Sequence, residues 1–571
     1  MITLQVPGSK SITNRAMLGA ALAHGTSVLK NALESDDTKF LKQALIKLGV
    51  SVRTKKNSVS VKGAKFKTSK QPLFCGNAGT AVRFLSAVLA TQPFPSVITG
   101  NKQMKKRPIG DLLDALRQLG AIAVSLKGTN TPPIKIEGPL LGGTCCINGN
   151  ISSQFLSGLL LASPLAKNDV TIQVRGRLVS KPYVDLTISV MKSFGILVQR
   201  DGYRKFFIRA GQKYRPQTFE VEGDASSASY FWGISALTGE PIEISNVPKK
   251  SLQADAIFRE ISLQKDHFHC ENFPDSAMTL IVLSALLKRK TVFTGLENLR
   301  VKECDRIKAL STELQKIGCR VKELHDGLVV YGNPDTLHPA SIKTYNDHRM
   351  AMCFGMLSVV LPGIKIENPG CVSKTYPNFW KDLTVVKSQL QARNLILTGM
   401  RGSGKSKLGS LLGRMLGRRF VDIDDLIEEK ERKSIPALVA SRGWKYFRML
   451  ERKAVKKIMS VRGTVIATGG GTLMNEQNLR MLKKNGKIIF LKCPLKIIRR
   501  RIAESITRPS LTGKKSFLDE LEEIYEKRKG KYQSIADATI DTSQQTHRKR
   551  YDFDLKITHL VNQMKRWGMV E

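Results

Sequence analysis

The chain contains a glycine-rich motif whose residue types suit the binding of a polyphosphate. It reads Gly399-x4-Gly404-Lys405-Ser406, and it follows an apolar run, Asn394 to Thr398, that predicts a buried strand. In such a loop the glycines let backbone N–H groups wrap the phosphates, the lysine reaches the outer phosphates, and the serine hydroxyl holds Mg²⁺. The motif therefore predicts a site for a nucleoside triphosphate.

The position of this motif divides the chain. A P-loop normally follows the first strand of its own α/β domain, yet this one lies near residue 400 of 571. We therefore predict a kinase-like domain over residues 389–571 and a separate body over residues 1–388. At ~150 residues per domain, the chain is long enough for several hydrophobic cores.

The composition favours anionic ligands. Lys and Arg total 92 against 48 Asp and Glu, a net charge of +44. A positive field of this size attracts nucleic acid or phosphorylated and carboxylated metabolites. Because the charge is spread through both halves instead of one tail or face, we expect small anions and no nucleic acid.

Cysteine usage and hydropathy predict a cytoplasmic protein. The nine cysteines include no C-x-x-C pair, and the first residues carry no secretory leader pattern. The longest apolar runs, such as Ala277 to Leu287, are far shorter than the ~20 residues that span a bilayer. His267 and His269 lack a third ligand nearby, so we expect ordinary histidines and no metal site there. The oligomeric state is left open.

A repeated pattern organises the first 388 residues. Six stretches share a polar, small-residue start, a nearly all-apolar helix-like run, a turn and a β-rich segment. The starts are Lys10-Ser-Ile-Thr-Asn-Arg15, Asn77-Ala-Gly-Thr-Ala-Val-Arg83, Ser152-Ser-Gln-Phe155, Asp224-Ala-Ser-Ser-Ala228, Asp275-Ser-Ala-Met278 and Asp347-His-Arg-Met350. Helices of this composition are buried. A buried helix can still offer the N–H groups and positive dipole of its first turn to an anion.

Cationic side chains accompany these helix starts. They are Lys10, Arg15, Arg83, Arg107, Arg306, Arg349 and Lys374. Ser, Asp and Asn at such positions could simply cap helices. Capping does not require the cations, so we favour a cleft that surrounds a polyanionic substrate.

Ten ordered motifs make residues 1–388 resemble the EPSP synthase (3-phosphoshikimate 1-carboxyvinyltransferase) family. They are Pro7-Gly-Ser-Lys-Ser-Ile-Thr-Asn-Arg15, Gly76-Asn-Ala-Gly-Thr-Ala-Val-Arg83, Arg107-Pro-Ile, Ser152-Ser-Gln154, Ser180-Lys-Pro-Tyr183, Glu222-Gly-Asp-Ala-Ser-Ser-Ala-Ser229, Pro274-Asp275, Arg300-Val-Lys-Glu-Cys-Asp-Arg306, Tyr345-Asn-Asp-His-Arg349 and Lys374. The resemblance implies an α+β body of six βαβαββ units in two globules, about 9–220 and 1–8 plus 221–388. The crossings are expected near Pro7–Ser9 and Glu220–Asp224.

The resemblance also implies a reaction and its residues. The family transfers the carboxyvinyl group of phosphoenolpyruvate to the 5-hydroxyl of shikimate 3-phosphate, releases phosphate, and needs no metal or organic cofactor. Shikimate 3-phosphate would contact Lys10, Ser11, Arg15, Ser152, Ser153, Gln154, Ser180, Tyr183, Asp275, Asn298 and Lys302. Phosphoenolpyruvate would contact Lys10, Gly79, Arg107, Gln154, Arg306, Arg349 and Lys374.

Addition followed by elimination requires a base for the hydroxyl and an acid for carbon C3 of phosphoenolpyruvate. By resemblance, Asp275 is the proton acceptor, and Glu303, Lys302 and Lys10 serve the proton transfers at C3 and the charge at the reacting centre. The simpler alternatives are a helix cap for Asp275 and an ion pair with Lys302 or Arg306 for Glu303. Phe84 stands where many relatives carry proline, which leaves sensitivity to the inhibitor glyphosate open.

Residues 389–571 resemble shikimate kinase, a doubly wound parallel α/β fold. The motifs are the P-loop, Asp422-x-Asp424, Phe447-Arg448 with Glu451, Gly469-Gly-Gly471, Arg508-Pro509 and Arg528-x3-Tyr532. The sequence predicts that Asp422 and Asp424 lie on the same face of a strand, at the end of that strand. Trp444 stands where an acidic residue is often found, and Lys407 where threonine is. Neither departure removes a group that the chemistry needs.

This second resemblance implies phosphorylation of shikimate at its 3-hydroxyl by ATP and Mg²⁺. Shikimate would contact Asp424, Arg448, Gly470 and Arg528. ATP would contact Gly402, Ser403, Gly404, Lys405, Ser406 and Arg508, the last in a lid from Ser505 to Ser516. Ser406 and Asp422 would order Mg²⁺, and Lys405 and Arg508 would be catalytic. Arg448 with Glu451 is also an ordinary i, i+3 pair, and Arg528 lies in a basic run.

Three functions compete at this point. The first is a bifunctional enzyme of two consecutive shikimate-pathway steps that lead toward chorismate and aromatic amino acids. The second is an enolpyruvyl transferase for a nucleotide sugar fused to another small-molecule kinase, which Ser152-Ser-Gln154 and Ser180-Lys-Pro-Tyr183 disfavour. The third is a basic RNA-processing protein, since RNA phosphate cyclases share the repeat architecture but lack the Arg-Val-Lys-Glu and Asn-Asp-His-Arg motifs. We favour the first, with shikimate, ATP, phosphoenolpyruvate and shikimate 3-phosphate as its small-molecule ligands.

Overall fold

The computed structural model describes residues 2–55, 58–261, 263–503, 517–543 and 550–570. It divides into two compact units, Ile2–Leu383 and Thr384–Glu571. The division falls inside helix α11 (Phe379–Gln391).

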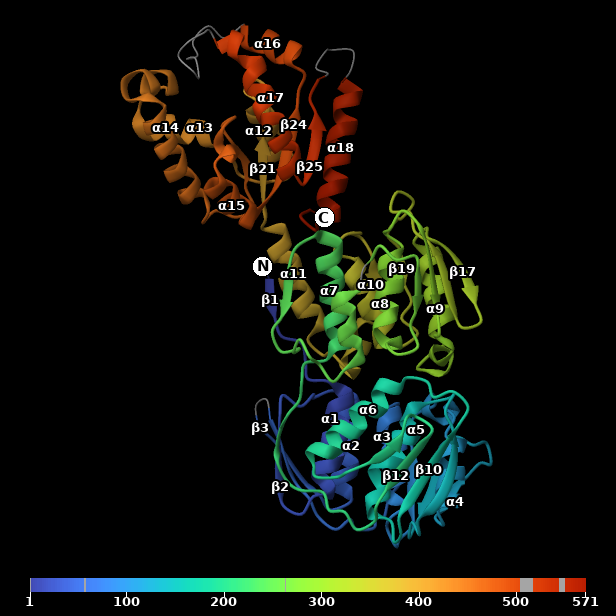
Figure 1. Ribbon diagram of the computed structural model, residues 1–571. Coiled ribbons are helices and arrows are strands. Elements are labelled where there is room, and N and C mark those ends of the chain that lie inside the picture. The colour runs from blue at the N-terminus through green and yellow to red at the C-terminus, as the bar shows by residue number, and fades with distance from the viewer. Residues whose placement is uncertain (1, 56–57, 262, 504–516, 544–549, 571) are drawn as a thin grey trace. The chain divides into compact units, whose positions relative to one another are not determined.

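One strand plan recurs through the first globule of unit Ile2–Leu383, drawn blue to teal in Figure 1. Each sheet joins one parallel pair to two antiparallel neighbours. The three sheets, in spatial order, are β13 (Thr218–Glu220)-β2 (Thr26–Lys30)-β4 (Ser58–Lys62)-β3 (Ser51–Lys55), β5 (Leu73–Phe74)-β6 (Ser96–Thr99)-β8 (Ile134–Glu137)-β7 (Ile122–Ser125) and β9 (Gly143–Asn148)-β10 (Val170–Arg175)-β12 (Lys205–Ile208)-β11 (Gln199–Asp201).

The second globule, green to yellow in Figure 1, repeats the plan once in full and twice in part. Its four-stranded sheet is β15 (His267–His269)-β16 (Lys290–Thr294)-β18 (Gly327–Tyr331)-β17 (Arg320–Leu324). Two parallel pairs complete it, β1 (Ile2–Leu4) with β14 (Ile242–Ile244) and β19 (Ser341–Ile342) with β20 (Lys365–Ile366). Six sheets thus form among the described residues of this unit, and the predicted α/β class of six related units is confirmed.

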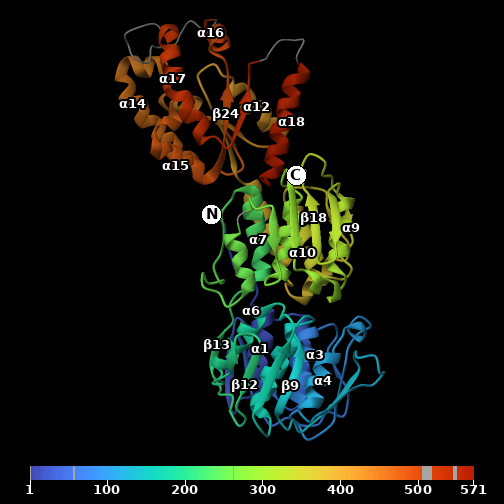
Figure 2. The same cartoon turned by 45° about the vertical axis from the view of Figure 1, so that its right-hand side comes forward.

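Six helices start at the predicted polar stretches. They are α1 (Lys10–Leu22), α3 (Gly79–Leu89), α5 (Ser153–Ala162), α7 (Ala225–Thr238), α8 (Pro274–Ser284) and α10 (His348–Leu357), and the two views place α1 and α3 in one globule and α7 and α10 in the other (Figure 1, Figure 2). Thr80, Gln154 and Asp275 are each the second residue of a helix, and each is the one residue of its helix that is not buried. Apolar helix bodies therefore fill the core, and in α3, α5 and α8 they leave one polar residue of the first turn accessible.

The chain crosses between the globules along two paired segments. Gly8 and Gly223 form an antiparallel bridge. Ser9 N–H donates to the Glu222 carbonyl at 2.8 Å, and Asp224 N–H donates to the Pro7 carbonyl at 2.8 Å. The first strand, β1, accordingly belongs to the second globule.

Unit Thr384–Glu571 is built on a five-stranded parallel sheet. Its order is β22 (Phe420–Asp422)-β23 (Val465–Ala467)-β21 (Asn394–Thr398)-β24 (Gly486–Lys492)-β25 (Ala538–Asp541). The central strand β21 is buried at every residue. Side chains alternate between its faces: Leu395 and Leu397 pack in one apolar cluster, and Ile396 packs in another.

Helices cover both faces of this sheet. α12 (Lys405–Met415) and α18 (Arg550–Arg566) supply the cluster around Leu395, while α14 (Ile435–Ile458) and α15 (Glu476–Asn485) supply the cluster around Ile396 (Figure 1, Figure 2). α13 (Ile423–Glu431), α16 (Leu495–Ala503) and α17 (Phe517–Ile535) complete the unit. No helix in the described part of the chain is long and apolar enough to cross a membrane.

One detail of the predicted strand at Asp422 is wrong. The strand ends at Asp422, and Asp424 lies in the first turn of α13 instead of on the strand. The Asp422 side chain accepts the backbone N–H of Asp424 at 3.0 Å and so caps the helix. Capping turns the chain from strand to helix within one residue.

Candidate active sites

Two neighbouring cavities lie where the inner helix ends of the two globules meet. The first is lined by Lys10, Asp37, Gly79, Thr80, Arg107, Gln154, Asp275, Lys302, Glu303, Arg306 and Arg349. The second is lined by Lys10, Ser11, Arg15, Thr80, Ile151, Ser152, Ser153, Gln154, Val179, Ser180, Tyr183, Pro274, Asp275, Asn298 and Lys302. The five residues common to both are Lys10, Thr80, Gln154, Asp275 and Lys302. The two cavities therefore share a wall that contains one carboxylate and two lysines.

Arg306 connects three carboxylates beneath this wall. Its Nε lies 2.8 Å from Asp347 Oδ2, and its two terminal nitrogens lie 3.1 Å from Asp275 Oδ1 and 2.9 Å from Glu303 Oε2. Arg306 is the first residue of α9 (Arg306–Lys316), and its side chain is only 2% exposed. A buried guanidinium with this many charged partners is held rigidly, because its planar fork fixes the geometry of each contact.

Asp275 is kept ionised by two arginines. Arg349 NH2 lies 2.8 Å from Asp275 Oδ2, opposite the contact from Arg306. Burial opposes ionisation of the Asp275 carboxyl, but Arg349 and Arg306 outweigh burial and hold its pKa well below the usual value. A carboxylate in this state accepts a proton from a substrate hydroxyl without first having to lose one of its own.

Glu303 and Lys302 are adjacent in sequence and differ in their surroundings. Glu303 Oε1 lies 2.6 Å from Lys374 Nζ, and although burial opposes its ionisation, Lys374 and Arg306 hold the pKa of its carboxyl well below the usual value. Burial instead lowers the pKa of Lys302 to about 8. Near neutral pH the Lys302 ammonium is therefore the more readily available proton of the two.

Arg107 and Gly79 face each other at the start of α3. The Arg107 guanidinium donates to the Asn77 carbonyl at 3.3 Å. A Cβ at position 79 would lie 2.8 Å from Arg107 NH2 and 2.4 Å from Arg83 NH1. Glycine at this position therefore lets two guanidinium groups approach the first turn of the helix.

The second cavity is bordered by hydroxyl and amide groups from both globules. Asn298 Nδ2 donates to Ser180 Oγ at 3.2 Å across the cleft. Arg15 lies below it, with Nε donating to Thr187 Oγ1 at 2.7 Å and NH1 donating to the Ser11 carbonyl at 2.8 Å. Burial lowers the pKa of Arg15 to about 10, so it stays cationic at neutral pH. All eleven residues predicted for shikimate 3-phosphate line this cavity.

Unit Thr384–Glu571 has a cavity of ≈ 580 Å³ beside the P-loop, within the usual range for small-molecule sites. Nine of its lining residues belong to the predicted nucleotide, metal or shikimate sets. They are Gly402, Gly404, Lys405, Ser406, Asp422, Asp424, Arg448, Gly470 and Arg528. Gly469 and Gly471 also line it. Ser403 is buried within the loop, and Arg508 with its lid lies outside the described residues.

The acidic side of this cavity fits a magnesium ion. Ser406 Oγ donates to Asp422 Oδ2 at 2.6 Å, which places two oxygen donors at the start of α12. Mg²⁺ prefers oxygen, uses few protein ligands, and completes its shell with water and phosphate. In the described part of the chain, no three His, Cys, Asp or Glu side chains form a metal cluster.

Asp424 differs from its neighbour Asp422 in environment. Its Oδ1 atom is buried, with no hydrogen-bond partner in the part of the chain that the structure describes. Burial, reinforced by Asp422, raises the pKa of Asp424 to about 6. The carboxyl is thus a free acceptor that points into the cavity wall beside Gly469, whose Cβ would lie 2.8 Å from Asp424 Oδ1.

Two arginines border the opposite side of the cavity. Arg448 NH1 donates to both carboxylate oxygens of Glu451, at 2.8 and 3.0 Å, and its guanidinium carbon lies 5.6 Å from the ring centre of Trp444. Arg528 NH1 donates to the Gly470 carbonyl at 3.1 Å. The alternative i, i+3 pair with Glu451 is therefore present at Arg448, whose guanidinium also lies close to Gly471: a Cβ built there would be 2.9 Å from its carbon.

The comparisons identify the first unit. Residues 2–269 and 258–383 match the family model for EPSP synthase (3-phosphoshikimate 1-carboxyvinyltransferase). The chain belongs to the EPSP synthase family. A 3-phosphoshikimate 1-carboxyvinyltransferase of Escherichia coli O1:K1 / APEC is 41% identical over 408 residues, 67% of this chain and 95% of the relative. A solved EPSP synthase from Acinetobacter baumannii superposes with a TM-score of 0.58 at 27% identity, over 67% of this chain and 95% of that one.

The second unit matches another model. Residues 401–561 match the model for shikimate kinase. A solved shikimate kinase from Acinetobacter baumannii, in complex with shikimate, aligns at 31% identity over 31% of this chain and 96% of that one, with a TM-score of 0.28. The family model, and not that superposition, assigns the domain. This EPSP synthase family member is therefore a bifunctional shikimate-pathway enzyme whose kinase domain uses a nucleotide.

Several site residues of the first unit were not predicted from sequence. Asp37 lies 3.3 Å from Lys10 Nζ, Thr80 accepts from the Gln154 amide at 3.2 Å, and Asp255 contacts Tyr183. Thr80 lay inside a recognised motif. Asp37 and Asp255 lie outside the quoted motifs, and only their place in the fold brings them to the cleft. Thr468 and Arg501 join the kinase cavity in the same way.

Proposed function

We propose that the first unit transfers the carboxyvinyl group of phosphoenolpyruvate to the 5-hydroxyl of shikimate 3-phosphate. One observation supports this assignment above the others: two anion-suited cavities meet at a wall made by Lys10, Asp275 and Lys302. The cavity lined by serines, Gln154 and Tyr183 suits a phosphorylated polyol. The cavity lined by arginines suits a small molecule with a phosphate and a carboxylate, because guanidinium pairs with both in a bidentate manner.

The chemistry at the shared wall follows from the charges there. Asp275 would take the proton of the 5-hydroxyl as its oxygen attacks C2 of phosphoenolpyruvate. C3 would gain a proton from the Lys302 ammonium, beside the Glu303 carboxylate. A C3 proton would then return to the Lys302 amine as phosphate leaves C2 with the proton held by Asp275, which restores the vinyl group. Lys10, Arg107, Arg306, Arg349 and Lys374 would balance the charge of the leaving phosphate and the carboxylate. No group beyond these side chains is required for the proton balance.

We propose that the second unit phosphorylates shikimate at the 3-hydroxyl with ATP. Arg448 and Arg528 would hold the carboxylate, and Asp424, with its free buried oxygen, would accept the hydroxyl proton. The backbone from Gly402 to Ser406 would bind the phosphates, and Lys405 and Arg508 would steady the phosphoryl group in transfer. Ser406 and Asp422 would hold Mg²⁺, which lowers the charge of the phosphates when bound.

Each reaction has a direct assay. With shikimate 3-phosphate and phosphoenolpyruvate supplied, the chain should release phosphate and form an enolpyruvyl product. With shikimate and ATP–Mg²⁺ it should form ADP, and with shikimate, ATP–Mg²⁺ and phosphoenolpyruvate it should carry out both steps.

The controls separate the competing functions. Replacing shikimate 3-phosphate with uridine diphosphate N-acetylglucosamine should abolish phosphate release, and replacing shikimate with quinate should greatly reduce ADP formation. If shikimate 3-phosphate gives no phosphate release while the nucleotide sugar does, the proposed transferase function is wrong.

A further inference from the structure

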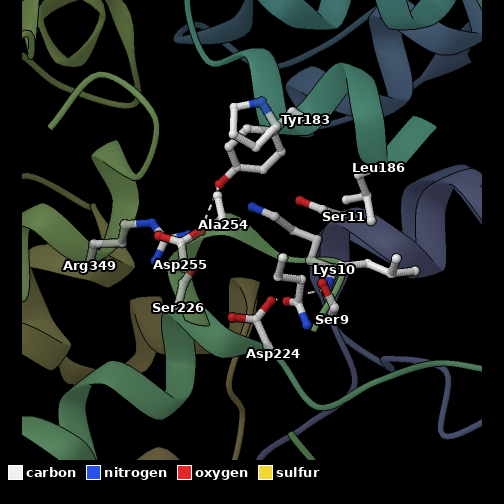
Figure 3. Close-up of a pocket in the computed structure, with 13 residues that line it drawn as sticks. Ser9, Lys10, Ser11, Tyr183, Leu186, Asp224, Ser226, Ala254, Asp255 and Arg349 are labelled. Atoms are coloured by element: carbon white, nitrogen blue, oxygen red, sulfur yellow. Dashed lines mark hydrogen bonds between the residues drawn. The ribbon is translucent and has the colours of Figure 1, made fainter. Parts of the chain in front are cut away.

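Asp255 is a buried carboxylate in the cleft to which neither predicted substrate set assigns a role. It lies in the short helix η3 (Ala254–Glu260) of the second globule and is 3% exposed. Figure 3 shows it between Tyr183, which comes from the first globule, and Arg349. A buried carboxylate needs partners for both oxygens, and those partners indicate what it does.

Each oxygen of Asp255 has a different partner. Oδ2 accepts the phenol O–H of Tyr183 at 2.9 Å, drawn as a dashed line in Figure 3. Oδ1 accepts the backbone N–H of Ser276 at 2.9 Å. Ser276 follows Asp275 directly in α8. Asp255 therefore contacts both the phenol in the cleft wall and the helix turn that carries the expected proton acceptor.

Neighbouring contacts fix the position of Asp255. The side chain of Gln253, two residues earlier, accepts the N–H of Ala225 at 3.1 Å and donates to the Gly223 carbonyl at 2.8 Å. Gly223 belongs to the crossing between the globules. The segment that carries Asp255 is thus tied, through Gln253, to the crossing and to the first turn of α7 (Ala225–Thr238).

The Tyr183 phenol faces two carboxylates but has one proton. Its oxygen lies 2.9 Å from Asp255 Oδ2 and 3.4 Å from Asp275 Oδ2. The shorter contact is the stronger hydrogen bond, so the proton points at Asp255. Asp275 Oδ2, which accepts from Arg349 NH2 at 2.8 Å, is then spared the phenol proton and can accept from a substrate hydroxyl instead.

We propose that Asp255 is a positioning residue for carboxyvinyl transfer: it holds the Tyr183 proton and the Ser276 N–H so that Asp275 remains open to the substrate hydroxyl. This inference rests on the proposed role of Asp275 as proton acceptor. Without Asp255, the phenol would donate to Asp275 and compete with the hydroxyl of the substrate for the same oxygen.

The ionisation states agree with this arrangement. Burial, together with the charges of Asp255 and Asp275, raises the pKa of the Tyr183 phenol, so the phenol keeps its proton. Burial and the Asp275 carboxylate raise the pKa of Asp255, while Arg349 and the Ser276 hydrogen bonds oppose the rise. The proposed role of Asp255 rests on its hydrogen-bond geometry and not on either pKa shift.

The first test is Asp255→Asn in the full chain. An amide can accept only through its oxygen, so it cannot hold both the phenol and the Ser276 N–H. We expect kcat for carboxyvinyl transfer to fall by about 10- to 100-fold, as for loss of a hydrogen bond to a charged group. The Kd for shikimate 3-phosphate should change by less than about threefold. A fall in binding with kcat intact would overturn the proposal.

The second test separates positioning from a structural role. Tyr183→Phe removes the phenol, so adding Asp255→Asn to it should lower kcat by less than about threefold. An equal loss from Asp255→Asn in both backgrounds would mean that Asp255 only supports α8, and the proposal would be wrong.

A matched control exists on the same helix as Tyr183. In α6 (Lys181–Ser193), Asp185 Oδ2 accepts the phenol of Tyr203 at 2.6 Å, outside both cavities. Asp185→Asn removes a contact of the same kind and should leave kcat unchanged, and a loss equal to that of Asp255→Asn would contradict the proposal.

The same experiments check whether each variant folds and whether the wild-type chain carries out carboxyvinyl transfer. Thermal unfolding is measured for each variant, and Asp255→Ser repeats the test with a smaller side chain. If neither Asp255 variant folds, Asp255 belongs to the scaffold and the proposal is overturned. Lack of carboxyvinyl transfer by the wild-type chain would instead refute the proposed function.

Discussion

Lys374 Nζ lies 2.6 Å from Oε1 of Glu303, and Glu303 lines the cavity proposed for phosphoenolpyruvate. Arg306 contacts the other oxygen of Glu303 at 2.9 Å, and Arg107 lies 4.0 Å from the first. All three cations are also expected ligands of phosphoenolpyruvate. While the cavity is empty, the Glu303 carboxylate therefore neutralises the three cations that would bind phosphoenolpyruvate. When phosphoenolpyruvate binds, these cations are shared, and the Glu303 carboxylate loses part of the stabilisation that they give it.

We expect Glu303→Gln to separate binding from turnover. An amide does not compete with the ligand for Lys374 and Arg306, so phosphoenolpyruvate should bind at least as tightly as to wild type. If Glu303 takes part in proton transfer at C3, kcat should fall by about 100-fold or more. Equilibrium binding with shikimate 3-phosphate present, together with initial rates, measures both quantities. Weaker binding with unchanged kcat would make Glu303 a ligand-positioning group only.

The two active sites should fail independently. Asp275→Asn removes the proton acceptor of the first unit and should lower carboxyvinyl transfer by about 10²- to 10⁴-fold while ADP formation from shikimate stays at the wild-type rate. Lys405→Ala should do the reverse, because we propose that its ammonium binds the ATP phosphates in the second unit. The two assays are run separately on each folded variant. Loss of both activities from either substitution would contradict independent sites.

Carboxyvinyl transfer should weaken in mildly alkaline solution. Burial lowers the pKa of Lys302 to about 8, with Asp275, Arg306, Glu303 and Arg107 as the charged groups around it. The ammonium form predominates below that pH and is lost above it, so kcat/KM for phosphoenolpyruvate should fall as pH rises through about 8. Lys302→Arg keeps its charge and should move this limb to higher pH. An unchanged limb in Lys302→Arg would assign the titration to another group.

The organisation of the first unit was predictable because buried helices impose a strict division of residue types. Buried helix bodies such as Ala16 to Ala21 of α1 are apolar, so Lys10 and Ser11 at the start of α1 needed another explanation than packing. The same reasoning located Gln154 and Asp275. Each is the accessible residue in the first turn of an otherwise buried helix.

The contacts of Asp37 and Asp255 could not be predicted in this way. Asp37 lies in the first turn of α2 (Asp36–Lys47), next to Ser35, whose capping box is a sufficient local explanation for polar residues there. Asp255 lies in a short helix with no periodic pattern. Their partners, Lys10 and Tyr183, are far away in sequence, and only the tertiary fold brings these pairs together. At Asp424 the sequence pattern predicted a strand, but the Asp422 side chain caps α13 and so places Asp424 in the first turn of that helix.

Gly471→Ala should impair shikimate binding through Arg448. The φ of Gly471 is −108°, a value that alanine adopts without strain. A Cβ there would lie 2.5 Å from Arg448 NH2 and 2.9 Å from its guanidinium carbon, so the flexible end of Arg448 must move. Loss of one bidentate contact to a carboxylate should raise KM for shikimate about 10-fold or more, with KM for ATP little changed. Gly530→Ala is the matched control, since its new Cβ would meet nothing within 4 Å beyond the backbone of its own helix. Equal effects of the two substitutions on KM for shikimate would show that Arg448 does not hold the carboxylate.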